Sequence, residues 1–214
     1  MPAKIKFCGM IQVQDAAVAA EAGAAYLGVV FAEGPRTVTV QGARQVVDAA
    51  AGVPVLGVFS DQSPEEILRI GERAGLSGAQ LHGSYSCADA AWLKAHGLVV
   101  WRVVRIAVPS DLDALEDAAL ESDAVLVEPW VPHARGGAGM PLELALAGEA
   151  RRRLVNHPMV LAGGLTPEKV GEAVARVRPE IVDVSSGVER LPGIKDPTKI
   201  ARFVEAVFAH SPIT

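Results

Sequence analysis

The sequence predicts an α/β fold: a (βα)8 TIM barrel in a single domain over residues 1–214, with eight parallel strands inside eight outer helices. Three observations lead to this fold. Short apolar runs alternate with segments of helical periodicity eight times along the chain. No linker or low-complexity stretch interrupts the alternation. Several apolar runs stop at a polar residue or a glycine, and active sites of such barrels lie at the carboxyl ends of the strands.

The expected strands are the apolar, β-branched runs at residues 4–8, 25–31, 53–59, 79–83, 98–104, 124–127, 159–162 and 181–184. A helix is expected after each strand. The first should be capped by Asp15 and the second should open at Thr39. The third has the clearest start, because Ser63 is a good cap and Pro64 suits the first helical position. The remaining helices should begin near residues 88, 110, 142, 166 and 196.

An open, doubly wound sheet is the alternative fold. It usually has fewer strands, and no glycine-rich dinucleotide fingerprint follows the first strand. The closed barrel is therefore the preferred interpretation.

Composition excludes several classes of function. The net charge of −5 argues against binding to nucleic acid or to an anionic membrane. No apolar run is long enough to span a bilayer. The two cysteines are far apart and the histidines do not cluster, so neither a disulfide framework nor a metal site is expected. These features indicate a reduced, cytoplasmic setting.

The loops after the last two strands suggest a phosphate site. Gly163 and Gly164 follow the seventh strand, and Ser185, Ser186 and Gly187 follow the eighth. In barrels of this kind these two loops often bind phosphate, since glycine allows backbone N–H groups to approach an anion closely. The alternative interpretation is a pair of ordinary glycine turns.

Cys8 ends the first strand, on the same face as Lys6. A thiol becomes a base or a nucleophile only when it is ionised, and a nearby lysine favours the ionised form. Barrel closure would bring the eighth strand beside the first, so Asp183 could pair with Lys6 or orient Cys8. A packed core thiol beside an internal Lys–Asp pair remains an equal alternative.

Other candidates also lie at predicted strand ends or in the loops that follow. Glu128 ends the sixth strand, and Arg36, in a Gly-Pro-Arg loop, could clamp a carboxylate. Gln80 and His82 alternate on the fourth strand, so both face one side. Each also has a structural interpretation, as a solvated loop residue or a buried polar group. The stretch of residues 136–139 is glycine-rich and suggests either a lid or a flexible turn.

Taken together, several motifs resemble the phosphoribosylanthranilate isomerase family, in the right order over essentially the whole chain. They are Lys6-Phe7-Cys8-Gly9, Gln80-Leu81-His82-Gly83, Leu161-Ala162-Gly163-Gly164-Leu165, Asp183-Val184-Ser185-Ser186-Gly187-Val188-Glu189, Pro192-Gly193 and Lys195-Asp196. Any one of these motifs alone would be weak support.

The resemblance implies an isomerase of tryptophan biosynthesis that carries out an Amadori rearrangement on a small phosphorylated substrate. It implies no cofactor and no metal. The expected assembly is a monomer or homodimer, with neither nucleic acid nor membrane as a partner. Cys8 would be the general base and Glu128 the general acid. Arg36 would hold the anthranilate carboxylate, and the last two loops would hold the phosphate. Gln80, His82 and Asp183 are expected to contact the substrate.

The chain departs from the family at three places. Glu128 stands where the family normally has Asp, and the loop from Gly136 to Pro141 lacks the family's usual hydroxyl and lysine. The loop after the second strand is also short. Two other functions therefore stay open: a barrel that binds sugar phosphates without catalysis, and a related dual-substrate phosphosugar isomerase. The second usually employs two carboxylates, and Cys8 in place of the first speaks against it.

Overall fold

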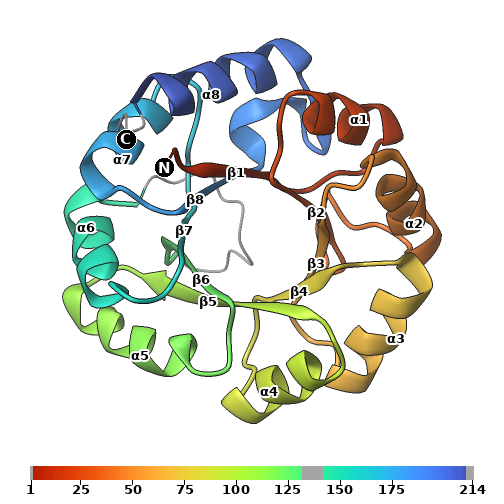
Figure 1. Ribbon diagram of the computed structural model, residues 1–214, viewed down its shortest axis with the longest axis horizontal. Coiled ribbons are helices and arrows are strands. Elements are labelled where there is room, and N and C mark those ends of the chain that lie inside the picture. The colour runs from red at the N-terminus through yellow and green to blue at the C-terminus, as the bar shows by residue number, and fades with distance from the viewer. Residues whose placement is uncertain (1, 132–141, 211–214) are drawn as a thin grey trace.

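The computed structural model describes residues 2–131 and 142–210. Its eight parallel strands close into a barrel in the order β1 to β8, and an outer ring of helices surrounds them (Figure 1). The strands are β1 Lys4–Phe7, β2 Tyr26–Val30, β3 Val55–Phe59, β4 Gly78–Leu81, β5 Val99–Ile106, β6 Ala124–Pro129, β7 Met159–Leu161 and β8 Ile181–Val184. The predicted (βα)8 barrel is thus confirmed.

The helices follow the strands in turn. They are α1 Val13–Glu21, α2 Val40–Ala49, α3 Pro64–Ala74, α4 Cys87–Ala95, α5 Ala114–Ala119, α6 Leu144–Arg153, α7 Val170–Val177 and α8 Pro197–His210. Within the described ranges, every helix is too short or too polar to cross a bilayer.

Side-chain alternation along β1 explains how the barrel is filled. Ile5 and Phe7 point outward, and the Phe7 ring meets the ring of Phe203 on α8 edge-on, with centroids 6.0 Å apart. Lys6 points inward, and its register partner on β8 is Asp183. The two side chains therefore meet inside the barrel because closure aligns the first strand with the last.

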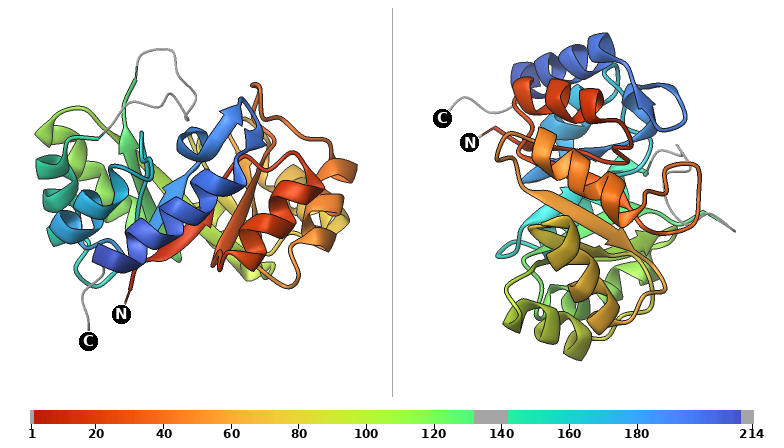
Figure 2. Two further views of the ribbon diagram at one scale, coloured as in Figure 1. Left: turned by 90° about the horizontal axis from the view of Figure 1, so that it is seen from above. Right: turned by 90° about the vertical axis from the view of Figure 1, so that its right-hand side faces the viewer.

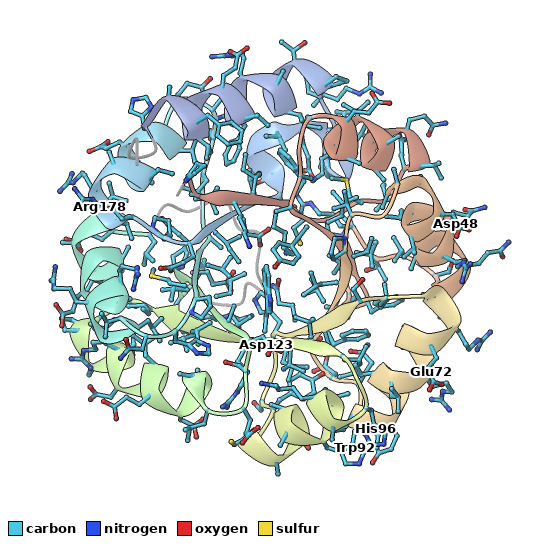
Figure 3. All side chains as sticks on the ribbon, viewed as in Figure 1. Asp48, Glu72, Trp92, His96, Asp123 and Arg178 are labelled. Carbon is cyan, nitrogen blue, oxygen red and sulfur yellow. The ribbon has the colours of Figure 1, made fainter. Side chains whose placement is uncertain are left out.

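A separate apolar cluster fills the barrel interior, and side chains occupy the centre of the ring (Figure 3). It consists of Leu56, Trp101, Ala124, Leu126, Val160, Ala162 and Ile181, with Tyr26 and Val103 against it. The Lys6 ammonium lies 5.7 Å from the centre of the Trp101 ring. A packed apolar core therefore lies directly beneath the charged groups of the barrel mouth.

Two of the expected helix caps are confirmed. Thr39 accepts a hydrogen bond from the backbone of Gly42, and Ser63 accepts one from the backbone of Glu66. Asp15 as the cap of the first helix is wrong, because the cap position is Gln12 and Asp15 is buried inside the first turn. The Asp15 carboxylate instead accepts the backbone N–H of Lys195 at 2.8 Å.

The chain between β8 and α8 contains structure that the strand–helix alternation did not predict. The short 3-10 helix η2, Ser186–Val188, leads into an antiparallel hairpin of β9 Glu189–Leu191 and β10 Ile194–Lys195. In the side view this hairpin lies at the end of the barrel away from the label N (Figure 2, left). The carboxyl ends of the barrel strands lie at that same end, and the hairpin lies at the rim of the mouth, between α8 and α1 (Figure 1).

Two other helix starts differ from expectation. The fifth helical segment opens as a 3-10 helix, η1 Pro109–Asp113, before α5 begins. The seventh helix begins at Val170, after a turn in which its N–H bonds back to Thr166. At both places an irregular turn connects the strand end to the helix, and the regular α-helix begins about one turn later than the sequence predicts.

The Phe7–Phe203 contact yields a prediction about stability. Phe203→Ala should lower the free energy of unfolding by about 3–5 kcal/mol, because a fully buried ring is lost and a cavity remains. Phe208→Ala is the matched control: its ring on the same helix is 50% exposed, and we expect a change within about 0.5 kcal/mol. Urea unfolding of both variants tests this, and equal losses would contradict it.

Candidate active site

The structure brings the predicted site residues to one end of the barrel. Cys8, His82 and Ser185 follow the carboxyl ends of β1, β4 and β8, and Glu128 lies near the end of β6. Arg36 lies in the loop after β2. Since all eight strands are parallel, these positions share one mouth.

Cys8 lies at the edge of this mouth beside a buried cation. Its backbone N–H donates to the carbonyl of Val184 on β8 at 2.9 Å, and its side chain is buried. Gly28 on β2 makes room for it: a Cβ there would lie 2.8 Å from Cys8 Sγ and 3.2 Å from Lys6 Nζ. The thiol and the ammonium therefore occupy one small space next to β2.

Lys6 is fully buried and holds its charge through two partners. Its Nζ donates to Asp183 Oδ1 and to Gln80 Oε1, both at 3.0 Å. Burial lowers the pKa of Lys6, but the charges and hydrogen bonds of Asp183 and Cys8 together outweigh burial and leave the pKa raised. The predicted pairing of Lys6 with Asp183 is confirmed.

The environment of Cys8 favours the protonated thiol in the free protein. Burial raises its pKa, and the negative charge of Asp183 acts in the same direction. Lys6 and Lys195 lower the pKa of Cys8, but not enough to reverse the effect of burial. The thiol can thus serve as a base only after its proton has left.

Glu128 is the centre of a second cluster, on the other side of the mouth. His82 Nε2 lies 2.7 Å from Glu128 Oε1, and Arg105 Nε donates to the same oxygen at 3.0 Å. Burial raises the pKa of this carboxyl, but the hydrogen bonds from His82 and Arg105 and the charge of Arg105 bring it below its usual value. Within the described residues both bonds reach Oε1, so Oε2 is the oxygen left for a proton.

Arg36 belongs to a third cluster, which includes the β9–β10 hairpin. Its Nε and Nη2 donate to the two carboxylate oxygens of Glu189 at 2.8 and 2.7 Å, a bidentate pair. Lys195 Nζ donates to Glu189 Oε1 at 2.9 Å and to the backbone carbonyls of Cys8 and Ser185 at 2.6 and 3.1 Å. Lys195 therefore connects the ends of β1 and β8 to the arginine after β2.

The loops after β7 and β8 lie against each other. Gly163 and Gly164 have φ angles of +100° and +60°, which side-chain-bearing residues rarely adopt. A Cβ on Gly187 would lie 1.8 Å from the carbonyl oxygen of Leu165, so only glycine allows the two backbones to come this close. The predicted phosphate-binding residues Ser185 and Ser186 lie in the same pair of loops, partly exposed.

A polar cavity of about 480 Å³ lies between the segments that follow β3 and β4 and the end of β5. Its wall includes His82 and Arg105, together with Asp61, Tyr85 and Asp89. Burial and the neighbouring carboxylates raise the pKa of Tyr85 to about 12, so its hydroxyl stays neutral. The Glu128 cluster therefore has a route to solvent on this side.

Four residues of these clusters were missed as site residues by the sequence reasoning. Arg105 and Gly28 lie inside strands, and Glu189 and Lys195 lie in a hairpin that was not expected. The glycine gave a usable signal, because a glycine within a strand often marks the close approach of another group. The residues 136–139 that suggested a lid lie outside the described residues.

In residues 2–131 and 142–210, no group of three or more His, Cys, Asp or Glu side chains is arranged to hold a metal ion. What the site offers is a thiol beside an ammonium, a carboxyl group between a histidine and an arginine, and glycine loops open to an anion. That set is suited to moving protons on a bound anionic molecule.

The ionised Glu128 should stabilise the fold in a pH-dependent way. Because its folded pKa is lowered, this stability is present above the unfolded pKa of about 4.3 and is lost as pH falls through the folded value. Glu128→Gln should therefore be less stable than the parent by about 1.5–3 kcal/mol near neutral pH, and the difference should shrink at low pH. Urea titrations at about pH 7 and about pH 3 test this, and a constant difference would contradict it.

Comparison with known proteins agrees with this arrangement. A family model described as N-(5'phosphoribosyl)anthranilate (PRA) isomerase matches residues 5–206. The N-(5'-phosphoribosyl)anthranilate isomerase of Rubrobacter xylanophilus is 40% identical over 206 residues, covering 95% of this chain and 98% of the relative. That of Chlorobaculum tepidum is 41% identical over 212 residues, covering 95% and 94%.

Solved structures agree as well. Phosphoribosyl anthranilate isomerase from Thermotoga maritima superposes with a TM-score of 0.86 at 31% identity, covering 97% of this chain and 99% of that one. A phosphoribosyl anthranilate isomerase in complex with reduced 1-(o-carboxyphenylamino)-1-deoxyribulose 5-phosphate has a TM-score of 0.83 at 30% identity, covering 97% and 99%. With both sequence and structure alike over nearly the full length, this chain belongs to the N-(5'-phosphoribosyl)anthranilate isomerase family.

Proposed function

We infer that this chain isomerises N-(5'-phosphoribosyl)anthranilate to 1-(2-carboxyphenylamino)-1-deoxyribulose 5-phosphate, an Amadori rearrangement of tryptophan biosynthesis. The observation that carries this inference is the shared mouth of Cys8, Glu128 and the two glycine loops, in a chain of this family. The reaction needs one acid and one base on either side of a bound sugar phosphate, and these groups supply both.

In the proposed reaction, Glu128 as the carboxylic acid gives its proton to the ring oxygen of the sugar. The bond between that oxygen and C1 breaks, and the nitrogen lone pair forms an iminium at C1. The Cys8 thiolate then takes the proton from C2, and the C–H electrons neutralise the nitrogen. The resulting enolamine tautomerises to the ketone. One proton enters and one leaves, so the product is an isomer of the substrate.

The remaining groups bind and orient the substrate in this proposal. Glu189 holds the Arg36 guanidinium through Nε and Nη2, which leaves Nη1 to reach the anthranilate carboxylate. The backbone of Gly163, Gly164 and Gly187 approaches the phosphate closely, with the Ser185 and Ser186 hydroxyls beside it.

The free protein holds its protons in the opposite arrangement. Burial favours the neutral thiol of Cys8, whereas His82 and Arg105 favour the ionised Glu128. The productive form has the same net charge but carries the proton on the carboxyl group instead of the thiol. Lys6 beside the sulfur stabilises the thiolate in that form. The two groups must therefore be considered as a coupled pair.

We place the protein in the cytoplasm, where thiols stay reduced. Cys8 and Cys87 are both free thiols, which fits such a compartment.

Substitution of the two proposed proton-transfer groups tests the mechanism. Cys8→Ser and Glu128→Gln should each lower turnover by at least about 100-fold, because each removes an acid–base group. Glu128→Asp should keep part of the activity, since it retains the charge but shortens the reach. The assay follows the loss of anthranilate fluorescence as freshly made phosphoribosylanthranilate is consumed.

Cys87→Ser is the matched control, because Cys87 begins α4 on the outside of the barrel. It should leave turnover within about threefold of the parent. Unchanged turnover in Cys8→Ser or Glu128→Gln would remove that residue from the mechanism. Tight binding of a product analogue by the parent chain without any turnover would favour a sugar-phosphate-binding barrel instead.

The inverted proton arrangement predicts the shape of the pH profile. If the lower pKa belongs to the acid and the higher one to the base, kcat/KM should stay level between about pH 5 and about pH 8. It should fall at lower pH as Glu128 of the free enzyme becomes protonated, and at higher pH as Cys8 loses its proton. A profile with a sharp optimum inside this range would contradict the assignment.

A further inference from the structure

A chain of hydrogen bonds crosses the barrel interior between the Cys8 side and the Glu128 side of the mouth. Asp183 accepts from Lys6, and Lys6 donates to Gln80 Oε1 at 3.0 Å. Gln80 Nε2 lies 3.5 Å from His82 Nδ1, and His82 Nε2 lies 2.7 Å from Glu128 Oε1. The four links join β8, β1, β4 and β6.

The direction of every link follows from its first donor. The ammonium of Lys6 has only hydrogens to offer, so the atom of Gln80 that faces it must be the carbonyl oxygen. The NH2 group of Gln80 then faces His82, and Nδ1 of that ring must accept. The ring hydrogen consequently lies on Nε2, where it is donated to the carboxylate of Glu128.

This order selects one form of His82. A doubly protonated imidazolium would bring a hydrogen on Nδ1 against the NH2 hydrogens of Gln80, which is repulsive. Gln80 cannot reverse its amide in response, because its NH2 group would then face the Lys6 ammonium. Gln80 is buried and both ends of its amide are engaged, so it has no other orientation to adopt.

We propose that Gln80 is a positioning residue that passes the orientation imposed by Lys6 to His82, which holds His82 as the neutral Nε2–H tautomer beside Glu128. The carboxyl group is then bonded by one cation, Arg105, and one neutral donor. A second cation at this place would hold Glu128 more firmly in the ionised form and make it a poorer proton donor. The inference rests on the proposed function, in which Glu128 is the acid.

The other charged groups around His82 make such a device necessary. Asp61 and Asp89 line the same cavity as His82, and Glu128 contacts the ring directly. Three negative charges therefore lie near the ring. Two positive charges, those of Arg105 and Lys6, lie on β5 and β1, and the Tyr85 hydroxyl is neutral. Gln80 contacts Nδ1 directly, and its NH2 group requires that this nitrogen carries no hydrogen.

Gln80→Glu is the sharpest test. The new carboxylate can accept from Lys6 with one oxygen and from an Nδ1–H of His82 with the other, so the imidazolium becomes the favoured form. Nitrogen-15 NMR of histidine-labelled protein at neutral pH should show one bare and one protonated ring nitrogen in the parent. In Gln80→Glu both should be protonated. Disappearance of the signals in His82→Asn assigns them among the five histidines.

The kinetic consequence is linked to the spectroscopic one. A cationic His82 lowers the tendency of Glu128 to hold a proton, so the level part of the kcat/KM profile should fall by about tenfold or more. The acid limb should move to lower pH by one unit for each tenfold fall, because both reflect the same proton affinity. A role in packing alone would change neither the limb nor the ring-nitrogen signals.

Two further variants keep the test decisive. Gln80→Met removes the donor to Nδ1 without adding a charge, and His82 should then show a mixture of forms at neutral pH. Gln45→Glu makes the same charge change on the exposed face of α2 and should alter neither the His82 signals nor the pH profile.

Three results would overturn the proposal. The first is a parent protein in which both ring nitrogens of His82 are protonated. The second is a Gln80→Glu variant with the parent's pattern, and the third is a changed His82 pattern with unchanged kcat/KM. If instead the parent shows the expected nitrogen pattern but no turnover of phosphoribosylanthranilate, the proposed function fails while the tautomer assignment stands.

Discussion

The ion pair between Lys6 and Asp183 lies fully inside the barrel, and the two sides of the mouth are organised around it. A lysine with no exposed surface is tolerated only when its charge is paired and its hydrogens are bonded. Asp183 on β8 supplies the charge, and Gln80 on β4 supplies an acceptor. The pair depends on barrel closure, since its two strands are the first and last of the sheet.

The Lys6 ammonium acts differently on the two sides of the mouth. On one side the ammonium stands beside the Cys8 thiol, where it favours loss of a proton. On the other side it reaches Glu128 only through two neutral links, Gln80 and His82. One cation thus influences both ends of the proposed reaction, directly at the base and by orientation at the acid.

The strand ends were predictable from the sequence because they follow from local pattern. Each apolar run stops where the barrel mouth begins, so Cys8, His82 and Glu128 could be assigned to one rim before any coordinates. Parallel closure was enough to bring Asp183 beside the first strand, where pairing with Lys6 was one of two expected contacts. These inferences need only alternation and strand order, which a sequence displays.

What could not be predicted depends on register and on irregular structure. Arg105 reaches Glu128 because the two are register partners on β5 and β6, and a shift by one residue would point it elsewhere. Glu189 and Lys195 meet Arg36 because a hairpin interrupts the strand–helix alternation. Asp is a residue type that often caps helices, but Asp15 instead accepts a hydrogen bond from the backbone of that hairpin. Contacts between residues so far apart in the chain leave no periodic pattern in the sequence from which they could be predicted.

Lys195 has a consequence for the order in which the protein is made. Its ammonium binds the carbonyl of Cys8, 187 positions earlier in the chain, and helps to hold Arg36 through Glu189. A polypeptide still being synthesised on the ribosome therefore has its thiol early but lacks the lysine that completes the surroundings. The surroundings of Arg36 are therefore complete only after the β9–β10 hairpin has formed and docked against the ends of β1 and β8, so this part of the site cannot assemble from the first half of the chain alone.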